Sequence, residues 1–296
     1  MFENKEAVVG QESIVKVAAV QLQPELGNVE ANVQKGIDMI KEAAAGGAKI
    51  IVLPELSTCG YVFNCREEAF AVAEPVPEGP TVKKWEAVAA ECGVYIVAGI
   101  PERDGDKLYN ICVLVGPNGY MGRYRKLHLW DREKLWFEPG DEGTPVFDTP
   151  YGRIAMMICY DMWHQEMWRI YGAVGADIVA CPTNFPCIPG LPDEMPSFGP
   201  ANCLVGCYDN GLSAILANRI GEERGLIFPG LSMVVSTLGQ AIDGVASRDQ
   251  EEIKYGEVNL MDSRRLHWTE FAGLRQDRRY DVYDLLCGAD GIVRPY

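Results

Sequence analysis

The sequence lacks an excess of basic residues, and this restricts the partners that it can have. Lysine and arginine total 27 against 42 aspartates and glutamates, which gives a formal net charge of −15 and a pI near 4.7. Phosphate backbones and anionic membrane surfaces attract basic proteins and repel strongly acidic ones. We therefore expect neither nucleic acid nor membrane as a partner.

Long apolar runs are also missing. No stretch reaches the roughly 18 to 20 apolar residues that a membrane-spanning helix requires. The first residues, MFENKEAVVGQES, carry acidic side chains where a signal peptide has basic ones, and they contain no apolar core. The ten cysteines are too sparse for a small disulfide-stabilised scaffold and suit a reducing compartment. These features predict a cytoplasmic protein.

Metal-binding motifs are absent as well. The three histidines, His128, His164 and His267, are scattered, and neither HExxH nor a pair of CxxC motifs occurs. Cys203 and Cys207 lie four residues apart, as do residues on one face of a helix, and packing in the core explains them more simply than a zinc site does. No glycine-rich phosphate loop is present either. We expect no metal and no cofactor.

What is present is an alternation of apolar strand-like runs with amphipathic helical stretches. The pattern predicts strands at 15–23, 49–56, 94–100, 153–160, 176–185, 212–221 and 231–242, helices at 28–45, 81–93, 164–175 and 200–211, and a hairpin at 108–129 that turns at Pro117. Interleaved strands and helices with hairpins among them predict an α/β fold of mixed sheets buried under helices.

The chain shows no linker and no sharp change of composition before residue 280. Its 296 residues are enough for one large core. We therefore predict a single domain over residues 1–296. A short extension is expected at about 1–14, and an extended arm at about 276–296 that reaches across a neighbour in an oligomer.

Three chemically useful side chains follow apolar runs. Glu55 ends IIVLPE, Lys126 lies in the strand-like segment RYRKLHL after the hairpin, and Cys159 ends IAMMIC. Taken singly, these residues read as a turn or cap carboxylate, a solvated charge and an inert buried thiol. Ligand sites of α/β sheets form at strand ends, where together they supply a base, a cation and a nucleophile.

The segments around these residues resemble a known family. PELSTCGY at 54–61, YRKLHL at 124–129 and ICYD at 158–161 look like the three signature segments of the nitrilase, or carbon-nitrogen hydrolase, superfamily. Their order and spacing match too, and the resemblance runs from about Val17 to about Leu286. It implies a four-layer αββα sandwich of two mixed β-sheets flanked by helices.

The resemblance also implies catalytic roles. Glu55 is expected to be the general base, Lys126 the stabiliser of the developing oxyanion together with the backbone N–H of Tyr160, and Cys159 the nucleophile. Family members often carry a second glutamate seven residues beyond the lysine that holds the geometry of the site. Glu133 occupies that position here, and its simpler reading is an exposed charge among Asp131, Arg132 and Lys134.

The residues after Cys159 bear on the substrate. Tyr160-Asp161 is the pattern more common among amidases, whereas nitrile-specific branches usually have Trp-Glu. Members that cleave N-carbamoyl amino acids often have two arginines next, and here Met162 and Trp163 cannot grip a carboxylate in that way. We expect an amidase acting on a small carboxamide. The alternatives are a nitrilase, an N-carbamoyl amide hydrolase and a catalytically silent binding protein on the same fold.

The expected substrate contacts are side chains beside the motif residues, which would form a mostly apolar pocket. They are Tyr61, Trp130, Tyr160, Trp163, Asn184 and Phe185, with Pro186; their simpler reading is aromatic core. The family's aromatic-Pro-Glu segment reads His164-Gln165-Glu166 here, and we expect His164 at a helix start, on the surface or at a subunit contact.

A homodimer or higher homo-oligomer is expected by resemblance, because family members commonly pair through the helix after the nucleophile. In MWRIYGAVG, Trp168 and Tyr171 have helical spacing. They serve either such a contact or packing on the sheet within one chain.

Overall fold

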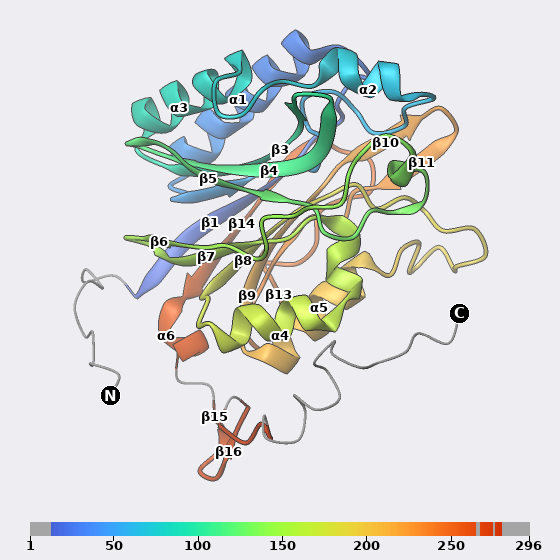
Figure 1. Ribbon diagram of the computed structural model, residues 1–296. Helices are drawn as coiled ribbons and strands as arrows, with labels where there is room; N and C mark the ends of the chain where they lie inside the picture. Colours follow the sequence, from blue (N-terminus) through green and yellow to red (C-terminus); the bar gives the residue numbers. More distant parts are fainter. Residues whose placement is uncertain (1–12, 265–266, 275, 280–296) are drawn as a thin grey trace.

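The computed structural model describes residues 13–264, 267–274 and 276–279. The extension expected at about 1–14 and the arm expected at about 276–296 lie almost entirely outside the described residues. Figure 1 shows four layers in the order helices, sheet, sheet, helices. The predicted αββα sandwich is therefore confirmed.

The first sheet has six strands in the order β14-β1-β2-β3-β4-β5. The three central strands β1, β2 and β3 run parallel, and the outer pairings are antiparallel. The bounds are β1 Ile14–Gln21, β2 Ile50–Val52, β3 Tyr95–Asp104, β4 Lys107–Gly116, β5 Gly119–Arg125 and β14 Glu252–Asn259.

The second sheet repeats this plan in the order β13-β12-β9-β8-β7-β6. Its centre, β7, β8 and β9, is parallel, and its edges are antiparallel. The bounds are β6 Val146–Thr149, β7 Gly152–Met156, β8 Ile178–Thr183, β9 Ser213–Asn218, β12 Met233–Val235 and β13 Ala241–Ile242.

Helices cover the outer face of each sheet (Figure 1). Helices α1 (Val29–Ala45) and α3 (Pro80–Cys92) lie on the first sheet, and α4 (Gln165–Ala173) and α5 (Gly199–Asn210) lie on the second. The shorter elements are α2 Arg66–Val72, α6 Leu260–Arg264, the 3-10 helices η1 Asp131–Leu135 and η2 Cys159–Trp163, and the ribbons β10 Ile220–Glu223 with β11 Leu226–Pro229 and β15 His267–Thr269 with β16 Ala272–Gly273.

Strand β1 shows how the sequence places the sheets. Val15, Val17 and Ala19 belong to the core between the two sheets. Ala18 and Val20 belong to the core under α1 and α3. Alternate side chains of a strand point to opposite faces, so the unbroken apolar run at 17–20 means that both faces are covered there.

The predicted elements are present, but several predicted strands are too long, and the strand predicted at 231–242 is in fact two strands, β12 and β13. The strand predicted at 49–56 ends at Val52, and the strand predicted at 153–160 ends at Met156. In each case the chain leaves the sheet before the residue with a candidate function, and Leu56 and Cys159 adopt left-handed backbone angles with φ of 45° and 50°. The sequence pattern did not predict the remaining elements, which are α2, α6, η1, η2, β6, β11, β14, β15 and β16.

The structure distinguishes between the two roles predicted for the aromatic residues of α4, a subunit contact and packing within one chain. Trp168 and Tyr171 are completely buried within the chain, and each donates a hydrogen bond to a backbone carbonyl, of Met162 and Met156 respectively. The reading in which they pack inside one chain is confirmed. The exposed apolar residues of this region are Ile170 and Val174.

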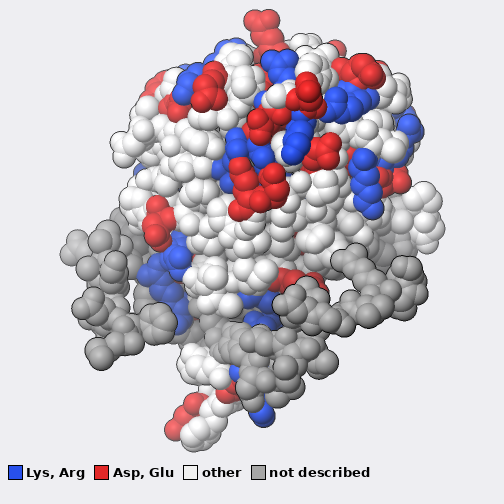
Figure 2. Space-filling model, in the orientation of Figure 1, with Lys and Arg blue, Asp and Glu red and all other residues white. Residues whose placement is uncertain are grey.

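The described surface carries mixed charge. Figure 2 shows acidic and basic side chains interleaved over the upper part of this face, where the first sheet and its helices lie, above a largely uncharged band. Several exposed charges of the described residues are paired; Lys35, for example, contacts Glu251. Within the described ranges, no helix has both the length and the apolar character needed to cross a bilayer.

All nine cysteines among the described residues are free thiols. Six are buried, Cys92 and Cys187 are partly buried, and Cys65, just before α2, is exposed. The nucleophile candidate Cys159 is thus one of several buried thiols, and only its surroundings distinguish it.

Candidate active site

Glu55 lies in the turn that follows β2 and is completely buried. This turn packs directly on β3, where a Cβ on Gly99 would lie 2.6 Å from the Cα of Glu55 and 2.5 Å from the backbone nitrogen of Leu56. Backbone hydrogen bonds from Gly99 to Pro54 and from Ser57 to Gly99 fix the turn there. Only glycine permits so close an approach of two backbones.

Lys126 lies one residue beyond the end of β5, and not within a strand as predicted. Its N–H still bonds to the carbonyl of Asn110 in β4, but its own carbonyl accepts a hydrogen bond from Gly140 in a later loop. The chain therefore leaves the sheet at Lys126. The preceding Arg125 anchors this point through a bidentate pair of hydrogen bonds to the buried Glu102, at 2.9 and 3.0 Å.

Cys159 opens η2, three residues after β7 ends, and its side chain is buried. Its φ of 50° is uncommon for a residue with a side chain. Backbone strain of this kind concentrates at functional sites, where surrounding contacts over-determine the conformation. The chain thus turns sharply at the thiol.

The ammonium of Lys126 joins two carboxylates. Its Nζ lies 2.6 Å from Glu55 Oε1 and 2.8 Å from Glu133 Oε1, with all three side chains buried. The amide of Asn110 also donates to Glu55 Oε1 at 2.6 Å, and the hydroxyl of Tyr61 donates to Glu133 Oε1 at 2.5 Å. The structure therefore brings together Glu55, Lys126 and Glu133, as the sequence indicated. Glu133 is buried and is not an exposed charge.

The charges of this cluster act on one another and on the thiol. Burial, reinforced by the charge of Glu55, raises the pKa of Cys159 well above its usual value, although Lys126 counteracts part of the rise. Burial also raises the pKa of Glu133 to about 7, against the lowering influence of Lys126. For Lys126, burial alone would lower the pKa, but the charges of Glu133 and Glu55 outweigh burial and raise it. At neutral pH the lysine is a cation and the resting cysteine is a thiol.

Several acceptor atoms in this region have no donor. Glu55 Oε2, Glu133 Oε2 and Asn184 Oδ1 are buried, and none has a hydrogen-bond partner among the described residues. Asn184 follows β8, and its amide group donates to the Glu55 carbonyl at 2.8 Å, which links the two sheets. Buried acceptors without a donor are costly, at about 1–3 kcal/mol each, unless a ligand satisfies them.

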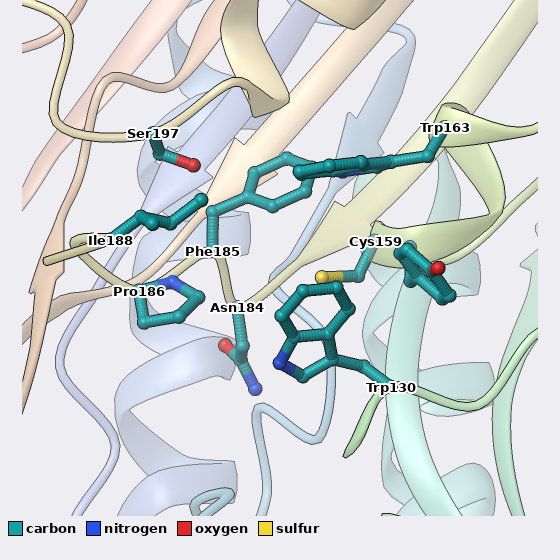
Figure 3. A pocket seen from close by; sticks show the side chains of 9 residues that line it. Trp130, Cys159, Trp163, Asn184, Phe185, Pro186, Ile188 and Ser197 are labelled. Atoms are coloured by element: carbon teal, nitrogen blue, oxygen red, sulfur yellow. The ribbon is translucent and has the colours of Figure 1, made fainter. Parts of the chain in front are cut away.

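Beside the thiol is a small apolar chamber of about 20 Å³ (Figure 3). The sulfur of Cys159 points into the space between Trp130 and Phe185. Its lining contains most of the expected contact residues, namely Trp130, Tyr160, Trp163, Asn184, Phe185 and Pro186, together with Ile188 and Ser197. Tyr61 is not part of this chamber.

A larger cavity of about 410 Å³ adjoins the chamber, with which it shares Trp130, Pro186 and Ile188. Tyr61 and Glu133 line this larger space. Tyr61 therefore lies near the site through its hydrogen bond to Glu133. Within the described part of the chain, no group of three or more metal-ligating side chains is placed to hold a metal ion.

The sequence profile of the carbon-nitrogen hydrolase family matches residues 16–267. This chain is a carbon-nitrogen hydrolase. It is 41% identical over 270 residues to a nitrilase from Pyrococcus abyssi, which covers 91% of this chain and 99% of the relative. It is 31% identical over 299 residues to an N-carbamoylputrescine amidase from Solanum lycopersicum, covering 94% and 96% of the two chains. The family's enzymes are thus of the nitrilase and amidase type.

A solved structure confirms the fold of this carbon-nitrogen hydrolase. An amidase from Nesterenkonia sp. superimposes with a TM-score of 0.75 at 23% sequence identity, covering 95% of this chain and 99% of the other.

Sequence reasoning missed two groups in the site of this hydrolase. Asn110 holds Glu55, and its signal was a lone amide within the buried strand LYNICVLVG. Asp161 was read only as a neighbour of the thiol. It is completely buried and accepts hydrogen bonds from Tyr124, His128 and Ile158, and no sequence signal indicated those partners.

His164 is the N-cap residue immediately before α4, as expected of a helix-start residue, and it is partly exposed. Its ring stacks on that of His128 with centroids 3.7 Å apart, and its Nε2 is buried.

Proposed function

We propose that this carbon-nitrogen hydrolase cleaves the C–N bond of a small primary carboxamide through a thioester on Cys159. The observation that supports an amide over a nitrile is the set of buried acceptors without donors, Glu55 Oε2, Glu133 Oε2 and Asn184 Oδ1. A carboxamide NH₂ brings two N–H donors to these acceptors, whereas a nitrile brings none and leaves them unpaired. The apolar lining of the chamber favours an uncharged, apolar acyl group.

In the first step Cys159 attacks the carbonyl carbon. Because the resting group is a thiol, its proton must leave as the S–C bond forms, and the Glu55 carboxylate is the base that takes it. Asn110 and Lys126 both hold Oε1 of Glu55, which leaves Oε2 for the proton. Negative charge then develops on the former carbonyl oxygen.

Lys126 stabilises this charge. An ammonium has three N–H donors, and two of them are used by Glu55 and Glu133. The third is available for the substrate oxygen, and the backbone N–H of Tyr160 serves as a second donor. Donors already held in place by the protein need no reorganisation during the reaction, and this is why such sites accelerate acyl transfer.

The tetrahedral intermediate collapses when Glu55 returns its proton to the nitrogen. The C–N bond breaks, ammonia leaves and the acyl group remains on sulfur as a thioester. A water molecule then gives a proton to Glu55 and attacks the thioester carbon. The C–S bond breaks, the carboxylic acid leaves, and the proton returns to Cys159.

Glu133 positions Lys126 and supplies an acceptor for the substrate NH₂. Its Oε1 receives Lys126 and the hydroxyl of Tyr61, so Oε2 is the oxygen left for the substrate. Tyr61 in turn is held by Glu223, which accepts a hydrogen bond from the backbone N–H of Tyr61 at 2.7 Å.

The N-carbamoyl alternative is the second candidate, because a ureido group also ends in NH₂. The residues after Asp161 disfavour a substrate with an α-carboxylate. Met162 is buried and Trp163 lines the apolar chamber, so neither supplies a cation. An uncharged ureide therefore belongs in the test.

The test compares an amide, a nitrile and a ureide with the same small acyl or alkyl group, with ammonia release as the readout. We expect turnover of the amide. Turnover of the nitrile alone would refute the choice of substrate, and turnover of the ureide alone would favour the carbamoyl alternative.

Intact-protein mass spectrometry during turnover tests the nucleophile. We expect an acyl adduct on the wild type and none on Cys159→Ala, while the exposed-thiol control Cys65→Ala acylates like the wild type. A Cys159→Ala protein that still hydrolyses the amide would overturn the proposed triad.

We also propose that this hydrolase is cytoplasmic and that it forms a homodimer or larger oligomer. The exposed residues Ile170 and Val174 on α4 and Val205 on α5 supply apolar surface for such a contact. Sedimentation velocity of the wild type and of Ile170→Lys tests this, and a wild-type monomer at micromolar concentration would contradict it.

A further inference from the structure

Two of the three histidines of the chain stack face to face beside the proposed nucleophile. His128 lies two residues after Lys126, and His164 lies five residues after Cys159. Their ring centroids are 3.7 Å apart and the ring planes are inclined by 18°. The pair therefore bridges the segment that carries the lysine and the segment that carries the thiol.

His128 is held in place by Asp161. Its ring Nδ1 lies 2.8 Å from Asp161 Oδ1, and its backbone N–H donates to the same oxygen at 2.9 Å. The other oxygen, Oδ2, accepts the hydroxyl of Tyr124 at 2.8 Å and the backbone N–H of Ile158 at 3.0 Å. One buried carboxylate thus joins the residue before Cys159 to the segment that follows Lys126.

His164 closes this arrangement from the other side. One face of its ring covers His128, and Tyr160 meets it edge to face with centroids 5.1 Å apart. Its Nε2 is buried and has no hydrogen-bond partner among the described residues. A neutral ring tolerates such a position, whereas a protonated ring has an N–H⁺ there that nothing accepts.

We propose that His164 is a positioning residue and that the stacked His128–His164 pair is a pH-sensitive clamp on the Cys159 turn. While at most one ring is charged, the stack keeps His128 on Asp161 and η2 in register with Lys126. When both rings are charged, they repel each other, the stack opens, and the turn loses its register. This proposal rests on the role proposed above for Cys159.

The charged groups around the pair set the pH at which it opens. Burial and the neighbouring His128 lower the pKa of His164, and the carboxylates of Asp161 and Glu166 offset only part of this effect. Tyr160 faces the pair with the edge of its ring, and Tyr124 faces it with the hydroxyl that it donates to Asp161. The clamp is therefore closed near neutral pH and opens only in more acidic solution.

Histidine NMR tests the clamp directly, because the chain has only three imidazoles and the third, His267, is exposed. We expect the His164 signals to titrate at lower pH in the wild type than in His128→Phe, which keeps a stacked ring without a charge. Titration of His164 at the same pH in both proteins would overturn the proposal.

Kinetics test whether the clamp reaches the nucleophile. The profile of kcat/KM against pH is measured for the wild type, His164→Phe and the control His267→Phe, each relative to its own rate at pH 8. Below about pH 6 we expect wild-type kcat/KM to fall more steeply than the single Glu133 step near pH 7 accounts for. His164→Phe should keep only that single step, while His267→Phe overlays the wild type. Glu133 is present in all three proteins, so its titration does not produce a difference between them.

A second variant separates stacking from charge. His164→Gln removes the ring, and we expect a lower kcat at pH 8 with little change in KM, because the turn that carries the thiol is less well held. Overlapping acid limbs for the wild type and His164→Phe would refute the clamp even if the fold is intact. If instead Cys159→Ala remained active, the proposed function would fail while the coupled histidine titration still stood.

Discussion

At the scale of single residues, the buried site has fewer hydrogen-bond donors than its carboxylate oxygens can accept. Lys126 satisfies one oxygen of Glu55 and one of Glu133, and the second oxygen of each carboxylate is left without a partner. Two buried carboxylates with one ammonium carry a net negative charge when both are ionised. Such a site is tuned to receive N–H groups and to take up a proton.

Replacing Glu133 by glutamine tests this arrangement. The change removes a charge that fixes Lys126 and an acceptor for the substrate, so we expect kcat/KM to fall by about 10²-fold, the size of one lost stabilising group. Steady-state kinetics measure the effect. Glu138→Gln, an exposed residue in the same segment, is the control and should behave like the wild type.

The same variant has a defined pH signature. Because the pKa of Glu133 is raised to about 7, wild-type kcat/KM should rise as this carboxyl ionises near that pH, and the glutamine variant should lack this step. A profile with the same step in both proteins would contradict the assignment.

The raised pKa also affects stability with a definite sign. The native state holds a proton on Glu133 more tightly than the unfolded chain does. This stabilisation is complete when the pH is below 4.5, the ordinary pKa of a glutamate, and it is lost as the pH rises through the raised pKa of about 7. Chemical unfolding should show the wild type losing up to about 3 kcal/mol relative to Glu133→Gln over that range. A stability difference independent of pH would contradict this.

Asp161 gives a further prediction at this scale. Asparagine keeps one acceptor but places an NH₂ against the donors that Asp161 now accepts, so Asp161→Asn should destabilise the protein by about 2–4 kcal/mol. Urea unfolding measures the loss. The exposed Asp148→Asn is the control and should change stability by less than about 0.5 kcal/mol.

The residue scale also shows how far sequence reasoning reaches. Glu55, Lys126 and Cys159 were singled out beside apolar runs, and the family resemblance gave them roles and added Glu133. The structure brings Glu55 and Lys126 together with Glu133. The contacts of Asp161 and Asn110 were not predicted, since they join residues 3 to 55 positions apart and arise from strand register and chain turns that no local pattern encodes.

At the scale of elements, the packing of α4 against α5 depends on one small residue. A Cβ on Gly206 would lie 2.3 Å from the indole of Trp168, closer than real contacts allow. The two helices approach through this pair, and α5 also lies against η2. The helix layer over the second sheet therefore supports the turn that carries Cys159.

Gly206→Ala should destabilise the protein by about 1–3 kcal/mol, because overpacking of the indole outweighs the gain of about 1 kcal/mol in helix propensity. Gly36→Ala in α1 is the matched control. There the new Cβ meets only a flexible methyl of Leu53 at 3.0 Å, so the cost should be smaller or absent. Thermal unfolding of both variants measures the two losses of stability, and equal losses would contradict the explanation by overpacking.

Strand ends were the elements predicted least well. Sequence periodicity does not reveal where a buried apolar run leaves the sheet, because residues such as Leu53 and Ile158 are as apolar and buried as those within it. Glu55 and Cys159 lie three residues beyond the ends of β2 and β7.

At the scale of the whole molecule, the two six-stranded sheets share one apolar interface while each has its own helix layer. The alternation of strands and helices in the sequence was enough to predict this class of fold. The pairing of β14 beside β1 was not predictable, since these partners are separated by more than 200 residues.

We expect the described layers to unfold as one unit, in line with the single domain predicted from the sequence. Val17→Ala removes packing between the sheets, and Val20→Ala removes packing under the helices. Each should cost about 1–3 kcal/mol. In urea, both variants should show one transition by circular dichroism and tryptophan fluorescence. A separate early transition in either variant would contradict a single unit.

The exposure of Cys65, at the start of α2, has a practical consequence for counting functional molecules. A thiol reagent in the absence of substrate meets this solvent-facing cysteine first, while the enclosed Cys159 is protonated and slow to react. Among the described residues, alkylation stoichiometry therefore counts Cys65 and the partly buried Cys92 and Cys187 ahead of the buried thiols, Cys159 included. A true titre of competent enzyme requires an acylating substrate analogue, because alkylation also counts thiols that take no part in the reaction.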